Sequence, residues 1–256
     1  MGEGPRPHRP VALLTGGARR VARTVAVHLA EHGFDVAITF RTSRRDADEA
    51  VAQLRGLGAA AVALQMEQTS VASIAQMFEA FDHAFPRLDL LVNSASIFEA
   101  AALLEVTEHQ WDAMIDTNLK GPFFVAQGAA RRMVANDPAG GLIVNVGDVK
   151  AERVGPRFAP YLISKGGLHT MTKVLAAELG PQGVRVNTVA LGPILLPDHY
   201  TKELKERAIG TTLLRRPGDP ADVAAAVRFL WDHGQWMTGA LLPVDGGRLA
   251  GSHSYT

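Results

Sequence analysis

The chain has 256 residues, of which 47% are hydrophobic and 20% charged, so it is long enough to bury one sizeable core. Lys and Arg together number 26, as do Asp and Glu, and this balance excludes a strong field that would recruit nucleic acid, an anionic membrane or an acidic partner. The absence of cysteine excludes a disulfide framework and a thiolate nucleophile. The nine histidines are scattered and predict no metal site. We therefore expect a cytoplasmic protein whose partner is a small molecule.

Residues 1–10 contain arginine and proline but no apolar stretch of signal-peptide length, which predicts a disordered lead-in. Beyond them, short apolar runs alternate with helix-length segments whose apolar residues recur at helical spacing. The predicted strands are Val11–Leu14, Val36–Phe40, Ala61–Leu64, Leu88–Val92, Leu142–Val146, Val184–Val189 and Ala240–Val244. The predicted helices are Ala22–His32, Arg45–Leu57, Ser70–Phe85, Thr107–Asn136, Tyr161–Leu179 and Ala221–Asp232.

This alternation predicts one α/β domain over residues 11–250, with a Rossmann-type, doubly wound architecture. Its seven-stranded sheet should be mostly parallel, with helices on both faces and ligands at the carboxyl ends of the strands. Residues 195–214 follow the sixth strand and carry many charges, and we expect them to form a mobile lid over the site. Residues 251–256 are predicted to be a C-terminal tail.

The first chemical signal is the stretch Thr15–Ala22, which follows the first strand and opens a helix. Glycines at such a turn allow close backbone approach to a pyrophosphate and leave N–H groups free at the helix N-terminus. Arg20 and Ala22 stand where further glycines would be expected, so an ordinary strand-to-helix turn is the alternative.

The second signal is the end of the second strand, which reads Phe40–Arg44 and has no carboxylate before Asp46. An NAD site usually places a carboxylate there for the ribose 2′-hydroxyl. Arg41 offers a planar fork of donors for a 2′-phosphate instead, and Thr42 and Ser43 add hydroxyl groups. The composition therefore favours NADPH over NADH, the alternative being a solvated basic loop.

The third signal is Tyr161 followed by Lys165 at the start of a helix. A spacing of four puts the phenol and the ammonium on one face, where the positive charge favours the phenolate. Lowering a tyrosine pKa from about 10 to about 7 needs about 4 kcal/mol of differential stabilisation. Alone, such a pair is an ordinary contact on a helix surface; its place after the two earlier signals favours proton transfer.

With Asn93–Ala95 after the fourth strand, Asn118, and Arg185–Asn187 on the sixth strand, these motifs make the chain resemble the short-chain dehydrogenase/reductase superfamily over nearly its whole length. The resemblance implies that Tyr161 is the general acid. It also implies that Lys165 orients the nicotinamide ribose and raises the acidity of the tyrosine, and that Asn118 supports a proton-relay water.

The same resemblance implies a set of NADPH contacts, although Glu67 replaces an expected aspartate near the adenine, Leu191 replaces a proline near the nicotinamide, and Ser94 replaces an asparagine. The implied cofactor contacts are Gly16, Arg20, Val21, Arg41, Thr42, Ser43, Glu67, Gln68, Asn93, Ser94, Ala95, Tyr161, Lys165, Gly192 and Ile194.

Asp148 is the most informative departure, because the superfamily usually has a serine at this place after the fifth strand. A carboxyl group there can accept bonds from ring N–H or amino groups, and the arrangement is similar to the pteridine reductases, including the dihydromonapterin reductase type. Arg20, Ser96 and Phe98 also match that group. The resemblance implies hydride transfer from NADPH to a C=N bond of a pterin, with a biopterin-like compound as the expected substrate and folate as a further option, and with the proton delivered through Tyr161 and Asp148.

The predicted catalytic residues are Asp148, Tyr161, Lys165 and Asn118, and the predicted substrate contacts are Arg20, Ser96, Phe98, Asp148 and Tyr161. Simpler readings stay open, since Phe98 can cap the core, Arg20 can pair with a surface carboxylate and Asp148 can be an ordinary loop residue.

The superfamily scaffold also reduces ketones, quinones and 3-oxoacyl thioesters, so a carbonyl or 3-oxoacyl reductase of unknown substrate is the alternative enzyme. A non-enzymatic NADPH sensor is a further alternative, which the intact Asn118, Tyr161 and Lys165 disfavour. By analogy with the superfamily, we expect a homotetramer built through the long helices and the last strand.

Overall fold

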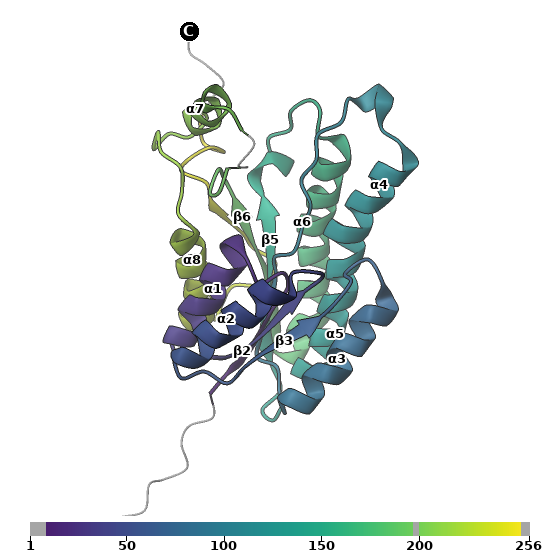
Figure 1. Ribbon diagram of the computed structural model, residues 1–256, viewed down its shortest axis with the longest axis vertical. Helices are drawn as coiled ribbons and strands as arrows, with labels where there is room; N and C mark the ends of the chain where they lie inside the picture. Colours follow the sequence, from purple (N-terminus) through teal and green to yellow (C-terminus); the bar gives the residue numbers. More distant parts are fainter. Residues whose placement is uncertain (1–8, 197–199, 252–256) are drawn as a thin grey trace, which may run out of the picture.

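The computed structural model describes residues 9–196 and 200–251. Seven strands form one sheet in the order β3-β2-β1-β4-β5-β6-β7, and all of its neighbouring strands pair in parallel (Figure 1). The predicted seven-stranded, doubly wound sheet is thereby confirmed. The strands are β1 (Val11–Leu14), β2 (Asp35–Phe40), β3 (Ala61–Gln65), β4 (Leu90–Asn93), β5 (Gly141–Asp148), β6 (Val184–Leu191) and β7 (Leu241–Val244).

Helices cover both faces of the sheet (Figure 1). On one face lie α1 (Arg20–Glu31), α2 (Arg44–Gly56) and α8 (Pro220–Asp232), with α1 in contact with both of the others. On the other face lie α3 (Val71–Ala84), α5 (Gly121–Ala135) and α6 (Ala159–Leu179), and α4 (Glu108–Ile115) packs against α6. Short 3-10 turns are η1 (Leu103–Glu105), η3 (Val149–Ala151) and η4 (Gly180–Gln182).

The two faces explain why the strands read as continuous apolar runs. Along β1, Ala12 and Leu14 join the core under α1 and α8, whereas Val11 and Leu13 join the core under α3 and α5. Each of these side chains is almost fully buried. A strand covered on both faces has no solvent side, so its hydrophobicity does not alternate.

The predicted helix over residues 107–136 is not one α-helix. It divides into α4, a π-helical turn η2 (Asp116–Lys120) and α5, and the π turn contains Asn118. Pro122 stands at the start of α5 and has no N–H with which to bond the carbonyl four residues earlier. The hydrogen-bond ladder is therefore interrupted where the chain widens to the π turn.

The parallel strands all end at the same edge of the sheet, and α7 (Lys202–Gly210) lies above that edge, near the ends of β5 and β6 (Figure 1). The predicted lid over residues 195–214 thus contains a helix, all of whose residues are exposed or half-exposed. Residues 197–199 of this segment lie outside the described residues, as do the lead-in through residue 8 and the tail from residue 252. In the parts described, no helix combines the length and apolar character needed to cross a membrane.

Candidate active site

Tyr161 and Asp148 meet at the carboxyl edge of the sheet. Asp148 is the last residue of β5 and Tyr161 lies in the first turn of α6; the Tyr161 hydroxyl donates a hydrogen bond of 2.7 Å to Asp148 Oδ2. Asp148 Oδ1 accepts a second bond, of 2.7 Å, from the backbone N–H of Lys150. Asp148 is therefore a strand-end residue whose carboxylate is fixed at both oxygens.

This pairing reverses one expectation about acidity. Burial raises the pKa of Tyr161 above its ordinary value, and the adjacent Asp148 raises it further through its charge and its hydrogen bond. The spacing of Lys165 from the tyrosine had predicted a lowered pKa for Tyr161. The net shift has the opposite direction, because a phenolate here would be desolvated and would face a carboxylate. Tyr161 is instead held in its protonated form.

Lys165 lies one helical turn beyond Tyr161 and is only 4% exposed. Its Nζ donates a 2.9 Å hydrogen bond to the carbonyl oxygen of Val146 on β5 and lies 6.0 Å from the centroid of the Tyr161 ring. Burial lowers the pKa of Lys165 to about 8, and the charge of Asp148 opposes that shift. The ammonium is thus anchored to the sheet beneath the tyrosine.

Asn118 is buried and uses both ends of its amide within the protein. Its Oδ1 accepts from the Ile97 N–H at 2.9 Å, and its Nδ2 donates to the Ile97 carbonyl at 3.0 Å and to Ser164 Oγ at 3.2 Å. Ser164 in turn donates to the Tyr161 carbonyl at 2.7 Å. Asn118 therefore ties the loop after β4 to the helix that carries the tyrosine, and its predicted role beside a relay water stays a prediction.

Phe98 belongs to an aromatic cluster beside the tyrosine. Its ring stacks on Phe158 with centroids 4.8 Å apart and 13° between planes, and it meets the Tyr161 ring edge-on at 4.8 Å. The Nζ atom of Lys150 lies 4.5 Å from the Phe98 centroid and 4.4 Å from the Phe158 centroid. Sequence reasoning missed Lys150 and Phe158; the available signal was their position next to Asp148 and just before α6.

The glycine turn after β1 fits a phosphate. Gly16 has a φ of +67°, and a Cβ added there would lie 3.2 Å from the Cβ of Ala95, so both the backbone conformation and the close approach of the loop after β4 favour glycine. Thr15 Oγ1 accepts from the N–H groups of Ser94 and Ala95 at 2.9 and 3.0 Å, joining the ends of β1 and β4. Among the described residues, no side chain caps the N-terminus of α1, whose first N–H groups are available to an anion.

The basic turn lies at the adjacent ends of β2 and β3. Arg41 and Thr42 are exposed. The Nη1 atom of Arg41 lies 3.9 Å from the Oε2 atom of Glu67. The other Glu67 oxygen accepts from the Thr69 N–H at 3.2 Å. Ser43 occupies the N-cap of α2. The structure thus gathers the donors predicted for a 2′-phosphate and adds a carboxylate that competes for Arg41.

Two predicted cofactor residues turn their side chains to the protein interior. Asn93 Nδ2 donates to Asn145 Oδ1 at 3.0 Å, and Gln68 Nε2 donates to the Thr117 carbonyl at 2.6 Å and the Ala95 carbonyl at 3.1 Å. Both side chains are buried. They hold the loop after β4 in place, while Asn93 Oδ1 and Gln68 Oε1 have no hydrogen-bond partner within the described residues.

Arg20 opens α1 with a φ of +55° and donates to the Leu195 carbonyl at 3.2 Å, so it contacts the start of the predicted lid, and among the described residues it forms no ion pair. Ser96 is exposed, and Val21 packs against the core. Gly192 is also constrained, since a Cβ there would lie 2.6 Å from the Asp245 Cα.

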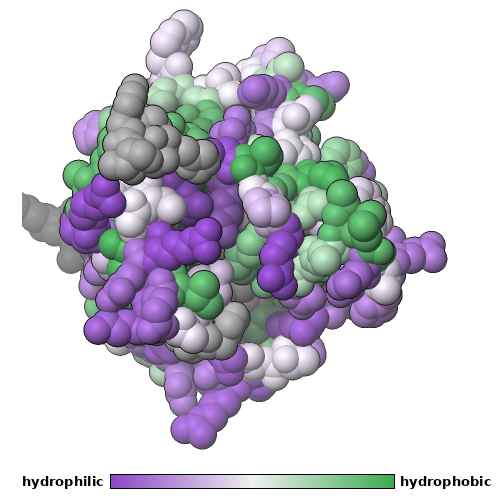
Figure 2. Space-filling model, turned by 90° about the horizontal axis from the view of Figure 1, so that it is seen from above, coloured by the Kyte–Doolittle hydropathy of each residue, from purple (hydrophilic) through white to green (hydrophobic). Residues whose placement is uncertain are grey.

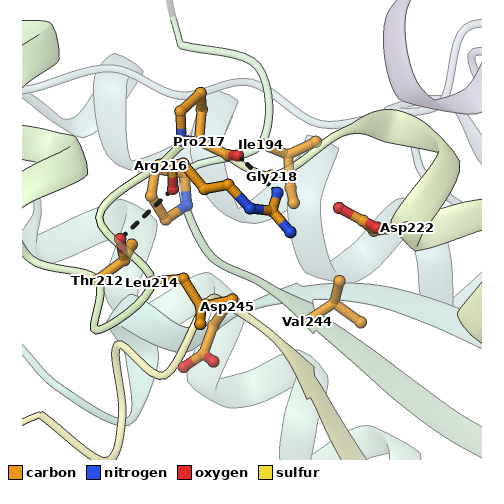
Figure 3. A pocket seen from close by; sticks show the side chains of 11 residues that line it. Ile194, Thr212, Leu214, Arg216, Pro217, Gly218, Asp222, Val244 and Asp245 are labelled. Atoms are coloured by element: carbon orange, nitrogen blue, oxygen red, sulfur yellow. Dashed lines mark hydrogen bonds between the residues drawn. The ribbon is translucent and has the colours of Figure 1, made fainter.

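Ile194 lines a cavity of about 40 Å³ under the lid segment, with Arg216 reaching across it and Asp222 at its far side (Figure 3). Ligand pockets usually have volumes of about 300 Å³ or more. This cavity is therefore a packing feature at the base of the segment and not the substrate site.

One group of side chains departs from the expectation of no metal-ligand spacing. Glu31 and His32 follow His28 by three and four residues on α1, and the ligand atoms of the three side chains lie within 4.8 Å of one another on its outer face. This grouping was not predicted from the sequence because only the histidine spacing was considered, without the intervening Glu31. The group lies at the end of α1 remote from Gly16 and takes no part in the candidate active site.

The fold and the site define a class: a doubly wound α/β protein with a phosphate-type turn after β1 and a tyrosine–lysine pair on α6. The chain matches, over residues 16–248, the family described as enoyl-(acyl carrier protein) reductase. It therefore belongs to the short-chain dehydrogenase/reductase superfamily and is a short-chain oxidoreductase.

Individual relatives support the same superfamily assignment. The chain is 35% identical over 239 residues to 3-oxoacyl-(acyl-carrier-protein) reductase of Staphylococcus aureus strain Mu50, covering 92% of this chain and 96% of the relative. It is 32% identical to the NADPH-dependent aldehyde reductase-like protein, chloroplastic, of Arabidopsis thaliana, covering 93% of each. A mutant short-chain dehydrogenase/reductase of Serratia marcescens superposes with a TM-score of 0.87 at 31% identity, over 93% of this chain and 97% of that one.

Proposed function

We propose that the protein is an NADPH-dependent carbonyl reductase, the function expected in the sequence analysis as the alternative to pterin reduction. The observation that carries the proposal is the hydrogen bond from the Tyr161 hydroxyl to Asp148 at the carboxyl edge of the sheet, with the anchored Lys165 one helical turn beyond. Relatives named for 3-oxoacyl and aldehyde reduction support a C=O substrate.

The chain's own residues account for proton transfer. Bound NADPH would supply the hydride. The raised pKa of Tyr161 keeps its hydroxyl protonated through the neutral range, so it acts as a proton donor. Its proton points at Asp148, and rotation about the C–O bond redirects it to a substrate oxygen. The ammonium of Lys165 offsets negative charge on the tyrosine oxygen as the proton leaves.

NADPH is proposed over NADH because Arg41 and Thr42 lie exposed at the end of β2. A 2′-phosphate there would gain a charge-assisted bond from the guanidinium and would displace the long 3.9 Å contact between Arg41 and Glu67. The turn at Gly16 and the start of α1 would hold the pyrophosphate.

Reduction of a pterin C=N bond is a second candidate, favoured by Asp148. A carboxylate that already accepts a bond from Tyr161 can accept another from a ring N–H or an amino group, and a serine hydroxyl in its place would not carry the charge. Phe98 offers an aromatic ring for a flat heterocycle, although Phe158 already covers one of its faces.

The test is NADPH oxidation by the purified protein, followed at the nicotinamide absorbance, with aldehydes, ketones and a 3-oxoacyl thioester beside dihydrobiopterin and dihydrofolate. NADH serves as the cofactor control and Tyr161→Phe as the catalytic control. Turnover of carbonyl compounds that is lost in Tyr161→Phe supports the proposal. Turnover confined to pterins replaces it with the second candidate, and cofactor binding without any turnover favours the non-enzymatic sensor.

We also propose that the protein is a cytoplasmic homotetramer with a lid over its site. Apolar side chains are exposed on the helices expected at the interface, with Phe123 on α5 at 38%, Ile163 on α6 at 50% and Val174 on α6 at 52% exposure. Viewed from above, hydrophobic residues also gather on the side where α4 lies (Figure 2). Light scattering of the purified protein at several concentrations tests the assembly.

The exposed α7 above the strand ends supports the lid. Protease protection of residues 200–214 on addition of NADPH and substrate tests it.

A further inference from the structure

Lys150 has the surroundings of a ligand-binding cation. It follows Asp148 by two residues, yet within the described residues its ammonium has neither a hydrogen bond nor an ion pair. Its neighbours are the faces of Phe98 and Phe158, at 4.5 and 4.4 Å. Burial lowers the pKa of Lys150, and the only carboxylate that opposes this shift, among the residues described, is Asp148. Cation–π contacts compensate only part of the hydration that such a charge loses.

The backbone of Lys150 is held firmly. The carboxylate of Asp148 accepts a 2.7 Å hydrogen bond from the backbone N–H of Lys150, and the preceding residue, Val149, is fully buried. On the other side, Glu152 Oε1 bonds the Nδ1 of His169 at 2.7 Å, which ties the end of this turn to α6. The backbone fixes where the side chain begins, and the contacts with Phe98 and Phe158 place its ammonium beside the two rings.

Lys150 is also close to the reaction centre. The Phe98 ring that it contacts touches the Tyr161 ring, so the ammonium lies one aromatic ring away from the proton donor. Arg248 contributes a second positive charge nearby, which lowers the pKa of Lys150 as like charges do. Asp148 is the opposing negative charge, and its two oxygens are already engaged by Tyr161 and by the Lys150 N–H.

We propose that Lys150 is a specificity residue that binds a carboxylate on the substrate, a few bonds from the carbon that is reduced, while Phe98 and Phe158 contact the apolar part. The inference rests on the proposed reductase function and narrows it to oxo compounds that carry a carboxylate. The carboxylate supplies a directly bonded counter-charge, which Asp148 does not because its oxygens bond Tyr161 and the Lys150 N–H, and the aromatic rings exclude water from the ion pair.

Lys150→Met tests the charge, because methionine keeps an unbranched apolar stem against the two rings. Lys150→Arg is the conservative control. Binding of benzoate and of the neutral benzamide to the protein saturated with NADP⁺ is measured by calorimetry, which needs no turnover. We expect benzoate to bind the native protein and to lose about ten- to hundredfold in affinity in Lys150→Met but not in Lys150→Arg. Benzamide affinity should change less than about threefold.

Turnover gives the second readout, with a 3-oxo acid compared with its methyl ester. We expect Lys150→Met to raise KM for the acid about tenfold or more, with kcat and the ester kinetics little changed. Equal losses for acid and ester, or equal binding of benzoate to the native protein and Lys150→Met, would overturn the role of Lys150. Benzoate binding that depends on Lys150, without reduction of either compound, would keep that role and reject the carbonyl reductase proposal.

Discussion

Replacing Lys165 by methionine should change how stability depends on pH. The pKa of this buried lysine is lowered from 10.5 to about 8. Between these values the unfolded chain binds more protons than the folded one, so the free energy of unfolding rises with pH. Below pH 8 the charged, buried lysine costs the fold about 3 kcal/mol, since one pKa unit corresponds to about 1.4 kcal/mol. About 2 kcal/mol of this should be regained between pH 7 and pH 9.5.

The assay is chemical denaturation of the native protein and Lys165→Met at pH 7 and pH 9.5, with Lys173→Met, an exposed position on the same helix, as control. The native protein and the control should gain about 2 kcal/mol over this interval relative to Lys165→Met. Loss of the bond to the Val146 carbonyl lowers the stability of the variant equally at both pH values. If all three proteins show parallel changes with pH, Lys165 keeps an ordinary pKa in the fold and the reasoning fails.

Further substitutions test other parts of the site. Tyr161→Phe should lower kcat by about a hundredfold or more while NADPH affinity, measured by nicotinamide fluorescence, is unchanged. Asp148→Ser removes the carboxylate whose charge raises the pKa of Lys165, which is about 8, so the alkaline limb of the kcat/KM profile should move to lower pH; an unmoved limb would contradict the influence of Asp148 on this lysine. Arg41→Ala should weaken NADPH binding about tenfold and leave NADH binding unchanged in paired titrations. Gly147→Ala would place a Cβ 2.4 Å from His169 Nε2 and should destabilise the fold by about 1–3 kcal/mol, read from denaturation midpoints.

The sheet could be predicted from the sequence because strands buried on both faces leave continuous apolar runs between helix-length segments. The ends of the strands were predicted less exactly than their existence. The fifth strand was predicted to stop at Val146, yet β5 continues to Asp148, which pairs with Leu191 at the end of β6. Pairing with β6 extends β5 through Gly147 and Asp148, two residue types that have a low intrinsic propensity for strands.

The site could be predicted only in part. Tyr161 and Lys165 are visible in the sequence because a helix brings residues four apart to one face. Phe158 and Lys150 were missed because their contacts with Phe98 join the connection between β5 and α6 to the separate loop after β4, and no local spacing encodes such a meeting. The sign of the Tyr161 pKa shift was also wrong, because burial and a carboxylate outweigh the cation one turn away.

An aspartate at position 148 changes what the site can recognise. A carboxylate accepts hydrogen bonds but donates none, so in the proposed reaction Tyr161 would be the donor for a substrate oxygen and Asp148 an acceptor beside it. A simple ketone uses only the donor and leaves the carboxylate to repel its developing negative charge. A compound with an N–H next to the reducible bond uses both groups. Substrates that combine such an N–H with a carboxylate in reach of Lys150 therefore match more of this site than plain ketones do.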